Sequence, residues 1–456
     1  MDENMIIVYD KISEFYAERK FADLRIALLD LEPADIAYFM EDKLDDKNQI
    51  VFFRLLPKDI ASDVFVEIDS DTQEALIKAF TDTELKAVLN DMFLDDTVDV
   101  IEEMPANVVK RILKATDSEN RKQINELLNY PDDCAGSIMT TEFISLSATL
   151  TVEQAFERIR KIGFDKETIY TCYVTDSRKH LKGVITVKTL LLSDKKAIIE
   201  DIMDTSVITA ETLEDKEAVA MKLSKYDFLA LPVIDTEGCL VGIVTVDDAL
   251  DVIHEEATED IQKMTAILPT EKEYLKQSVW RIWLTRIPWL LVLMVSATFT
   301  GLILNEYESA LTSSLLIACI PMLMGTGGNA GSQASVTIVR SLALGEVEFK
   351  DVFRVLWKEL RASLLLAISL AIVCFGKLLL IDKLIFGYDY TLIICAVVSI
   401  SMFATIVLAK LVGCVLPLLA KKLRLDPAVV ASPFITTIVD ILSLIIYCFI
   451  AIALLN

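Results

Sequence analysis

Residues 324–333, MGTGGNAGSQ, decide how the second half of this 456-residue chain folds. They lie in an uncharged segment, 310–339, that is long enough to cross a bilayer. The four glycines are expected to allow close backbone approach, while Asn329, Ser332 and Gln333 add polar groups where lipid offers no water. Such groups are tolerated at depth only where they are buried in protein or line a water-filled cavity. The stretch therefore indicates either a close helix contact or a wet path through the membrane.

Five segments in this half are apolar and long enough to be membrane spans. The N-terminus has no basic start and no long apolar run, so it is not a signal peptide. Basic residues precede the first span and fill the loops between spans two and three and between spans four and five. The positive-inside rule predicts that the chain crosses the cell membrane five times, with its N-terminus in the cytoplasm and its C-terminus outside. The predicted spans are 282–304, 310–339, 362–381, 390–420 and 427–455.

The charge is concentrated in the first half of the chain. From Glu271 onward there are 15 Lys and Arg against 12 Asp and Glu, so the first 270 residues carry 29 against 56, a net charge of −27. This balance argues against a nucleic-acid partner, which needs neutralising Lys and Arg, and favours cations. Eight scattered cysteines and two histidines make a zinc site improbable. Five of the cysteines lie in apolar runs and are expected to pack as small hydrophobes.

Residues 1–130 are predicted to form an all-α domain of repeated helices. Pro33 and Pro57 stand 24 residues apart in similar segments, and Pro105 follows another 48 residues on, which is twice the same period. Proline is common at helix starts, so the spacing predicts a stack of helix pairs.

Two later segments match each other and read as tandem α/β repeats, 135–200 and 201–250. CYVTDSRKHLKGVITVKTLL, 172–191, aligns with LPVIDTEGCLVGIVTVDDAL, 231–250, at a constant offset of 59. Each copy reads as strand, polar turn, strand and helix. The doubled pattern resembles a pair of CBS domains. Such pairs often bind adenine nucleotides through a Thr and an Asp three residues later, which Thr245 and Asp248 provide, whereas the first copy has Thr189 in place of the acid; an ATP-like ligand therefore stays open.

Residues 246–270 are predicted to form an acidic connecting helix. Leu250, Ile253, Ala257, Ile261 and Met264 recur at helical spacing and predict one apolar stripe. The other faces carry seven acids within fourteen residues and no Lys or Arg. Such an acidic run is typical of a helix face exposed to solvent, and a cation-binding face is the alternative.

Asp440 is the acid predicted to lie deepest in a span. A carboxylate near mid-membrane costs roughly 3 kcal/mol on the insertion scale, so it needs a wet cavity, a partner or an ion. Thr436 precedes it by one helical turn on the same face. Oxygen-rich groups with one carboxylate suit a hard cation that keeps its waters, as Mg²⁺ does.

Taken together, these motifs resemble the MgtE family of magnesium channels along nearly the whole chain. The signatures are PMLMGTGGNAGSQ, followed by VRSLALGEV, and LDPAVVASPFITTIVD, together with the acidic run EEATEDI. The resemblance implies a homodimer in which Asp440 and its twin hold a hydrated Mg²⁺ in a pore between subunits, residues 275–456 forming the pore domain. Ser332 stands where the family often has Asn, and Ser432 is a similar change. The pore set is Asp440, Thr436, Asn329, Gly328, Ser332 and Gln333.

The resemblance also implies a cytosolic sensor, in which Mg²⁺ bridges carboxylates and closes the pore. Like charges that repel one another can pack together when cations arrive, so the residues favour the same reading. The implied sensor residues are Asp91, Asp95, Asp215, Glu217, Asp227, Asp248, Asp251, Glu256, Glu259 and Asp260.

Three other functions compete with a channel. A secondary exchanger would use Asp440 to bind a proton or Na⁺ in alternation with the metal. An intramembrane aspartyl protease would pair Asp440 with Asp389, although Asp389 falls at the outer edge of its span. A membrane-tethered nucleotide sensor leaves the polar glycine stretch unexplained.

Overall fold

The computed structural model describes residues 3–270, 274–307, 313–430 and 432–455. The chain divides into two compact units, Met1–Ile253 and His254–Asn456, and each is described by itself. The division falls inside helix α15, Val246–Met264, so one helix contributes to both units.

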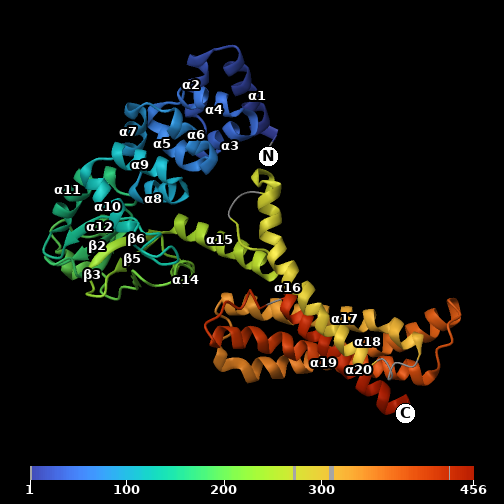
Figure 1. The fold of residues 1–456 in the computed structure, drawn as a ribbon. Helices are drawn as coiled ribbons and strands as arrows, with labels where there is room; N and C mark the ends of the chain where they lie inside the picture. The colour runs from blue at the N-terminus through green and yellow to red at the C-terminus, as the bar shows by residue number, and fades with distance from the viewer. Residues whose placement is uncertain (1–2, 271–273, 308–312, 431, 456) are drawn as a thin grey trace. The chain divides into compact units, whose positions relative to one another are not determined.

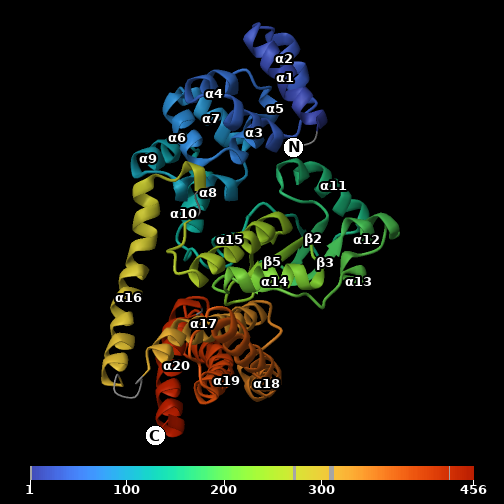
Figure 2. The same cartoon turned by 90° about the vertical axis from the view of Figure 1, so that its right-hand side faces the viewer.

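The first unit begins with a stack of helices, as the proline spacing predicts (Figures 1 and 2). Pro33 opens α3, Pro57 and Pro105 precede α5 and α9 directly, and Thr81 takes the same place before α7. Helices two positions apart in sequence pack on each other, α3 on α5, α5 on α7 and α7 on α9, so the 24-residue repeat is confirmed. The helices are α1 (Glu3–Ala17), α2 (Phe21–Leu29), α3 (Pro33–Lys43), α4 (Asp46–Phe53), α5 (Lys58–Glu67), α6 (Ser70–Ala79), α7 (Asp82–Asp91), α8 (Leu94–Glu103), α9 (Ala106–Ala115) and α10 (Ser118–Leu127).

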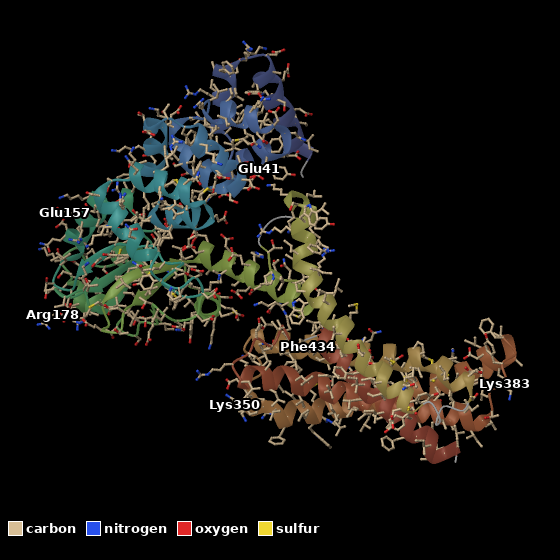
Figure 3. All side chains as sticks on the ribbon, viewed as in Figure 1. Glu41, Glu157, Arg178, Lys350, Lys383 and Phe434 are labelled. Carbon is tan, nitrogen blue, oxygen red and sulfur yellow. The ribbon has the colours of Figure 1, made fainter. Side chains whose placement is uncertain are left out.

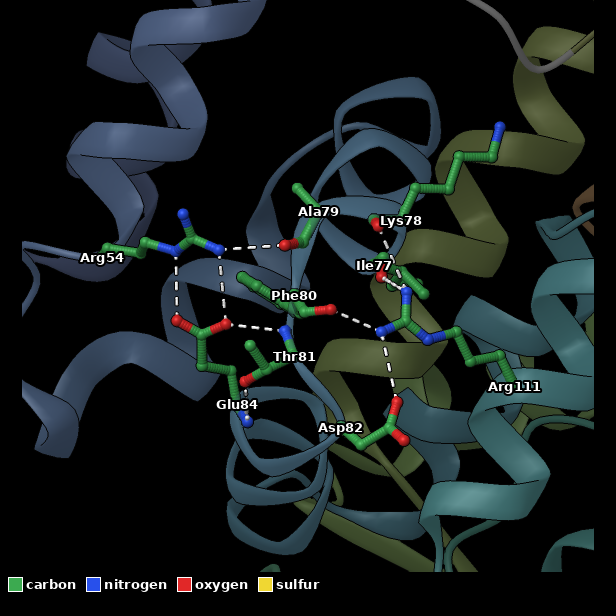
Figure 4. A network of polar contacts seen from close by, with 9 residues as sticks. All are labelled: Arg54, Ile77, Lys78, Ala79, Phe80, Thr81, Asp82, Glu84 and Arg111. Atoms are coloured by element: carbon green, nitrogen blue, oxygen red, sulfur yellow. Dashed lines mark hydrogen bonds and ion pairs between the residues drawn. The ribbon is translucent and has the colours of Figure 1, made fainter.

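Polar contacts around the start of α7 fasten successive helix pairs (Figure 4). The Thr81 hydroxyl accepts the backbone N–H of Glu84, and the Glu84 carboxylate accepts the N–H of Thr81, a capping box. Arg54 reaches Glu84 at 3.1 Å from the preceding pair. Arg111 donates to the carbonyl oxygen of Phe80 from the following pair. One cap thus ties three neighbouring repeats together.

The two α/β repeats have the same sheet topology. Each sheet pairs its first strand parallel and its last strand antiparallel to the middle one, and both break register at the same place. A side chain at Gly183 would collide with Asp204, and one at Gly242 with Thr140, which explains why both glycines keep the offset of 59. The elements are β1 (Ser145–Ser147), α11 (Val152–Ile162), η1 (Gly163–Asp165), β2 (Thr171–Thr175), β3 (Leu181–Thr186), α12 (Val187–Leu192), α13 (Ile199–Ile202), β4 (Ala210–Glu211), α14 (Lys216–Tyr226), β5 (Ala230–Ile234) and β6 (Leu240–Thr245).

The connecting helix α15 begins where it was predicted but ends at Met264 instead of 270, since Ala266 has a left-handed conformation with φ of 58°. The predicted apolar stripe is also wrong in part. Leu250 and Ile261 are 52% and 63% exposed, whereas Ala249 and Val252 are buried in the core of the first unit. Packing against the core of the first unit fixes the rotation of α15 about its axis. Ala249 and Val252 therefore face this core, and Leu250 does not. Met264 packs on the membrane unit, against Val339 and Ala428.

The described residues of the second unit include five helices that are long and apolar enough to cross a membrane, in agreement with the five predicted spans. The fifth begins at Ser432, later than predicted, because residues 427–430 form a turn after Asp426. The predicted start of the second span, Ala310, lies outside the described residues. The elements are η2 (Tyr274–Lys276), α16 (Val279–Glu306), α17 (Ser314–Ala343), η4 (Phe349–Asp351), α18 (Val352–Lys377), the π-helix η5 (Leu378–Ile385), α19 (Leu392–Lys422) and α20 (Ser432–Leu455).

Basic residues gather at one end of this helix bundle. Lys421 at the end of α19 donates to the carbonyl oxygen of Leu342 at the end of α17, at 3.1 Å. Lys422 lies 4.5 Å from the ring centroid of Phe349, just before α18. Figure 3 shows Lys350 at this end and Lys383 at the opposite end. The loops predicted to share one side of the membrane therefore lie together.

Candidate functional site: an intramembrane carboxylate and a cytosolic acidic cluster

The glycine-rich stretch is part of the continuous helix α17, and two of its glycines are packing positions. A side chain at Gly327 would collide with Thr405 of α19, and one at Gly331 with Ile435 of α20. Gly413 of α19 lies so close to the carbonyl oxygen of Gly331 that no Cβ fits. A Cβ built on Gly325 would have nothing within 4 Å, so no described part of the chain packs on this glycine, and the alternative that it approaches an ion's water shell stays a prediction. Its position on the helix turns it away from α19 and α20.

The third glycine, Gly328, lies beside the deep carboxylate. A Cβ built on Gly328 would lie 3.0 Å from the Thr436 methyl group and 3.8 Å from Asp440 Oδ1. Ser332 Oγ and Thr436 Oγ1 are 3.5 Å apart. Asp440 Oδ1 is buried and has no hydrogen-bond partner among the described residues. The structure thus brings Asp440, Thr436, Gly328 and Ser332 together around an oxygen that lacks a partner.

A cavity of about 520 Å³ adjoins Asp440. Residues of α16, α17 and α20 line it, with the threonines Thr436 and Thr437 and the helix start Pro433 next to the carboxylate. Its α16 wall is apolar apart from Thr300. The polar atoms of this cavity are therefore concentrated on α20.

The two remaining predicted pore residues do not contact Asp440. Asn329 and Gln333 are exposed, and with Gly325 and Val336 they form one face of α17 that points away from the other helices of the chain. An amide-bearing face is costly against lipid, so it requires water or another polypeptide.

Besides Lys377, three charged side chains of the spanning helices, Asp382, Lys410 and Glu359, were not predicted. Asp382 is 7% exposed in η5 and pairs with Lys377 at 2.6 Å, so Asp440 is not the only buried acid of this unit. The predicted third span stopped one residue short of Asp382. Lys410 is 7% exposed on α19, and Glu359 Oε2 on α18 is buried without a partner in the described chain. A search for single charges inside long apolar helices would have found Lys410.

The first unit contains an acidic cluster where α8 meets the α/β repeats and the start of α15. Burial raises the pKa of Asp95 and Asp96 to about 7; the charge of Asp96 adds to the rise at Asp95, and the charge of Asp248 adds to the rise at Asp96. Burial and the charge of Asp95 raise the pKa of Asp248 to about 7, and the pKa of Glu167 is raised to about 8 in the same way. Asp95 Oδ1 and Glu167 Oε2 have no hydrogen-bond partner within the described residues. These carboxylates repel one another when ionised.

Two of the cluster acids, Asp95 and Asp248, were predicted, while Asp96 and Glu167 were not. Asp99 also faces the cluster, and its pKa is raised by lost hydration and then by Asp248. A helix that carries Asp95, Asp96 and Asp99 at its start was visible in the sequence as LDDTVD. The contribution of Glu167 was not, because it comes from the first α/β repeat.

A second acidic contact links the helical stack to α15. Burial and then the charge of Asp251 raise the pKa of Glu67, which ends α5. Asp251 was predicted, and Glu67 is its unpredicted neighbour. Like the larger cluster, this contact sets a carboxylate of the stack against one of the connecting helix.

Four predicted sensor residues lie elsewhere. Asp91 is exposed at the end of α7. The Asp215 carboxylate caps α14 by accepting the N–H of Ala218, and Asp227 ends that helix in a left-handed conformation with φ of 53°. Glu217 follows Asp215 in the first turn of α14.

The far end of α15 belongs to the second unit and is held by an ion pair. Lys263 lies 2.7 Å from Asp426 and 2.8 Å from Glu259. Burial lowers the pKa of Lys263, but hydrogen bonds to these two carboxylates more than offset it and raise it overall. Burial and then Asp426 raise the pKa of Asp260. Glu256 precedes this group by one turn and is half-buried.

Among the described residues, no three Asp, Glu, His or Cys side chains converge on one point that fits a metal ion. The cluster therefore offers carboxylates from several elements that do not surround a single position. This arrangement suits a hydrated ion that contacts protein partly through its waters.

The nucleotide motif is satisfied internally. Thr245 donates its hydroxyl proton to Asp248, and Asp248 lies among the cluster acids. A polyphosphate placed there would meet like charges. The threonines of the first copy, Thr186 and Thr189, are hydrogen-bonded to each other at 3.0 Å.

Three family models match the chain. A model described as "Divalent cation transporter", MgtE, covers residues 320–450, the "MgtE intracellular N domain" covers 31–133, and the CBS domain covers 135–195 and 199–255. The magnesium transporter MgtE of Thermus thermophilus is 34% identical over 452 residues, 98% of each chain. That of Enterococcus faecalis is 36% identical over 331 residues, 72% of this chain and 71% of that protein.

Solved structures of soluble relatives agree with the first unit. The soluble part of a magnesium transporter is 33% identical with a TM-score of 0.52, covering 56% of this chain and 99% of that one. The cytosolic domain of the Mg²⁺ channel MgtE in complex with ATP is 34% identical with a TM-score of 0.51, covering 54% and 99%. Since similarity extends from the helical stack through both CBS repeats to the spanning helices, the chain belongs to the MgtE family.

Proposed function

We propose that this protein is a Mg²⁺ channel of the cell membrane that mediates magnesium uptake and is closed by Mg²⁺ binding to its cytosolic acids. The observation that carries the proposal is the partnerless oxygen of Asp440, buried in a spanning helix beside Gly328 and Thr436. The relatives that match nearly the whole chain are named magnesium transporters. A hydrated Mg²⁺ would satisfy this oxygen through its water shell.

The pore is proposed to lie between two copies of the chain. Asn329, Ser332 and Gln333 lie on or next to the exposed face of α17, on the helix that carries Gly328. A second copy would remove this face from lipid and bring two Asp440 carboxylates around one axis, with the amides as further ligands for water. The basic end of the bundle and the acidic unit face the cytoplasm in this proposal, and the C-terminus lies outside.

Closure is proposed to depend on the acidic cluster. Asp95, Asp96, Asp248 and Glu167 come from three different parts of the first unit, so cations that bridge them would hold these parts together. Without cations, repulsion would separate them and free α15. Further bridges are proposed at Asp91, Asp215, Glu217, Asp227, Asp251, Glu256, Glu259 and Asp260.

An adenine nucleotide at the CBS pair is a secondary proposal. It is supported by the ATP complex of the relative's cytosolic domain. The position of Thr245 and Asp248 within the acidic cluster makes these two residues poor phosphate neighbours, so the nucleotide would bind away from them.

Flux into liposomes that contain the purified chain tests the proposal. Mg²⁺ is varied separately on each side while pH and Na⁺ are clamped equal. A channel is expected to pass Mg²⁺ down its gradient alone and to close when Mg²⁺ rises on the side of the acidic unit. Uptake that requires a proton or Na⁺ gradient would instead establish the exchanger.

A further inference from the structure

A cavity of about 710 Å³ in the first unit has no role in the proposed function. It lies between α10 and the hairpin turns of the two CBS repeats. Its volume falls within the roughly 300–1,000 Å³ that small-molecule sites occupy. Thr245 and Asp248 are not among its described lining residues, so it is separate from the nucleotide motif.

Three cations at this cavity are available for an anion. Lys166, Arg178 and Lys179 line it, and none has a carboxylate within 4 Å in the described chain. Arg178 and Lys179 are exposed neighbours in the first hairpin turn, and Figure 3 shows Arg178 at the edge of the repeats. Two adjacent cations that form no ion pair in the described chain favour binding of an anion beside them.

The acids of the cavity wall are mostly engaged already. Glu142 accepts the backbone N–H of Leu94 at 3.2 Å, and Asp235 accepts that of Cys239 at 2.8 Å. Glu126 lies 3.5 Å from Lys122. These hydrogen bonds leave Glu142 and Asp235 charged, so the wall carries four acids against three cations. The positive charge is local: Arg178 and Lys179 stand together in the first hairpin turn, whereas Glu119 and Glu126 lie on α10.

The rest of the wall is rich in uncharged hydrogen-bonding groups. Asn120 and Gln123 lie one turn apart on α10, and Gln123 Oε1 accepts the Thr141 hydroxyl at 3.2 Å, which leaves its amide N–H groups as donors. The hydroxyls of Ser145 and Thr175 lie on the opposite wall, 2.8 Å apart. Such groups suit a ligand with several hydroxyls, and the volume exceeds what a phosphate ion would fill.

We propose that this cavity binds a phosphorylated polyhydroxyl metabolite, of the sugar-phosphate class, whose phosphate meets Arg178 and Lys179. The ligand would join α10 of the helical stack to both CBS repeats. Glu142 lines the cavity and also binds the start of α8, which carries Asp95 and Asp96. This inference rests on the proposed Mg²⁺ sensor. The ligand would favour the same arrangement of the helical stack and the CBS repeats as the cations do, so the ligand and Mg²⁺ would each strengthen the binding of the other.

Calorimetric titration of the full-length chain in detergent, at fixed free Mg²⁺, tests the proposal. The probes are ribose 5-phosphate, glucose 6-phosphate, ribose and inorganic phosphate. At least one sugar phosphate is expected to bind at least tenfold more tightly than ribose and phosphate alone, and to lower the Mg²⁺ concentration that half-closes the channel. The double variant Arg178→Gln with Lys179→Asn is expected to weaken binding at least tenfold. Asn is chosen because Lys179 has a φ of 67°, which Asn tolerates.

The control removes two adjacent exposed charges outside the cavity, Lys195→Asn with Lys196→Gln, and is expected to bind normally. The proposal is overturned if neither sugar phosphate binds, if inorganic phosphate binds as tightly, or if the Arg178 and Lys179 variant matches the control. Asp440→Asn is expected to bind the probe unchanged, since binding does not need transport. If a sugar phosphate binds but Mg²⁺ does not close the channel, the proposed sensor alone is overturned. If Mg²⁺ closes the channel but no sugar phosphate binds, this inference alone is overturned.

Discussion

The two acidic regions of this molecule use carboxylates in opposite ways. In the membrane unit one acid, Asp440, carries an unpaired oxygen next to glycine and threonine. In the first unit several acids from α8, α15 and the first CBS repeat crowd together and raise one another's pKa. One site depends on a single charge and the other on many.

The difference follows from the surroundings. Within spanning helices the dielectric is low, so a single carboxylate interacts strongly with an ion and is costly without one. Near water one exposed ion pair contributes only about 0–1 kcal/mol, so a switch needs several bridges that act together. We therefore expect the first site to fail on one substitution and the second to weaken in steps.

The largest effect is expected from Asp440→Asn. Removing the charge that faces the ion should lower Mg²⁺ flux by about tenfold to hundredfold, the range of a lost charge-assisted contact of about 1.5–3 kcal/mol. Flux into liposomes measures it. The matched control is Asp389→Asn, an exposed acid of the same unit, which should leave flux unchanged. Equal losses in both variants would contradict a special role for Asp440.

Removal of residues 1–265 is expected to abolish closure without abolishing flux. The truncated chain lacks every cluster acid, so it should conduct at Mg²⁺ concentrations that silence the full chain. Flux at low and high Mg²⁺ on the cytosolic side measures the difference. If the truncated chain elutes as a single folded species but carries no Mg²⁺ flux, the proposed sensor is ruled out.

Neutralising the cluster in steps sharpens the comparison. Asp95→Asn is expected to raise the Mg²⁺ concentration for half-closure a few-fold, and Asp95→Asn with Asp248→Asn to raise it further. Asp10→Asn, at an exposed position of α1, is the matched control. Complete loss of Mg²⁺-dependent closure from one substitution would mean that closure does not depend on several bridges acting together.

Gly413→Ala tests whether helix packing supports the membrane site. The new methyl group would strike the Gly331 carbonyl group, and such overpacking costs about 1–3 kcal/mol. Thermal unfolding in detergent should show a lower midpoint. Gly325→Ala, where nothing lies within 4 Å, should not lower it.

The smallest expected effect is that of pH on the cluster. Asp95, Asp96 and Asp248 have pKa values of about 7 in the fold, above the unfolded values near 4. The folded state therefore binds more protons between pH 4 and 7, so without Mg²⁺ the free energy of unfolding falls as pH rises through this range. Because Mg²⁺ must displace these protons, it should stabilise the chain more at pH 8 than at pH 6, and binding at pH 6.5 should release protons.

Calorimetry in two buffers of different ionisation enthalpy detects that release. The Asp95→Asn with Asp248→Asn variant is expected to release fewer protons. Equal release by the variant and the parent chain would place the titrating groups elsewhere.

Local patterns predicted most of the fold because they depend on neighbouring residues. Each region could be recognised from its own residues: the helical stack from the 24-residue proline period, the CBS repeats from the offset of 59, and the spans from their apolar runs. Patterns failed where a distant element decided the outcome. Leu250 is exposed because the core of the first unit accepts Ala249 and Val252 instead. The burial of Asp382 was missed for a local reason, because the predicted span ended one residue before it and Lys377, five residues earlier, pairs with it.

By itself, the sequence determined the order of helical stack, CBS repeats and spans, the surplus of acids in the first part and the lone carboxylate of α20. Only the tertiary structure decided which acids meet. The pair Asp95 and Asp96, Glu167 and Asp248 come from three distant parts of the chain, whereas Asp215 serves as a helix cap although its charge is the same. Composition fixes how many charges a chain carries, but repulsion and desolvation act over a few ångströms, and those distances are set by packing.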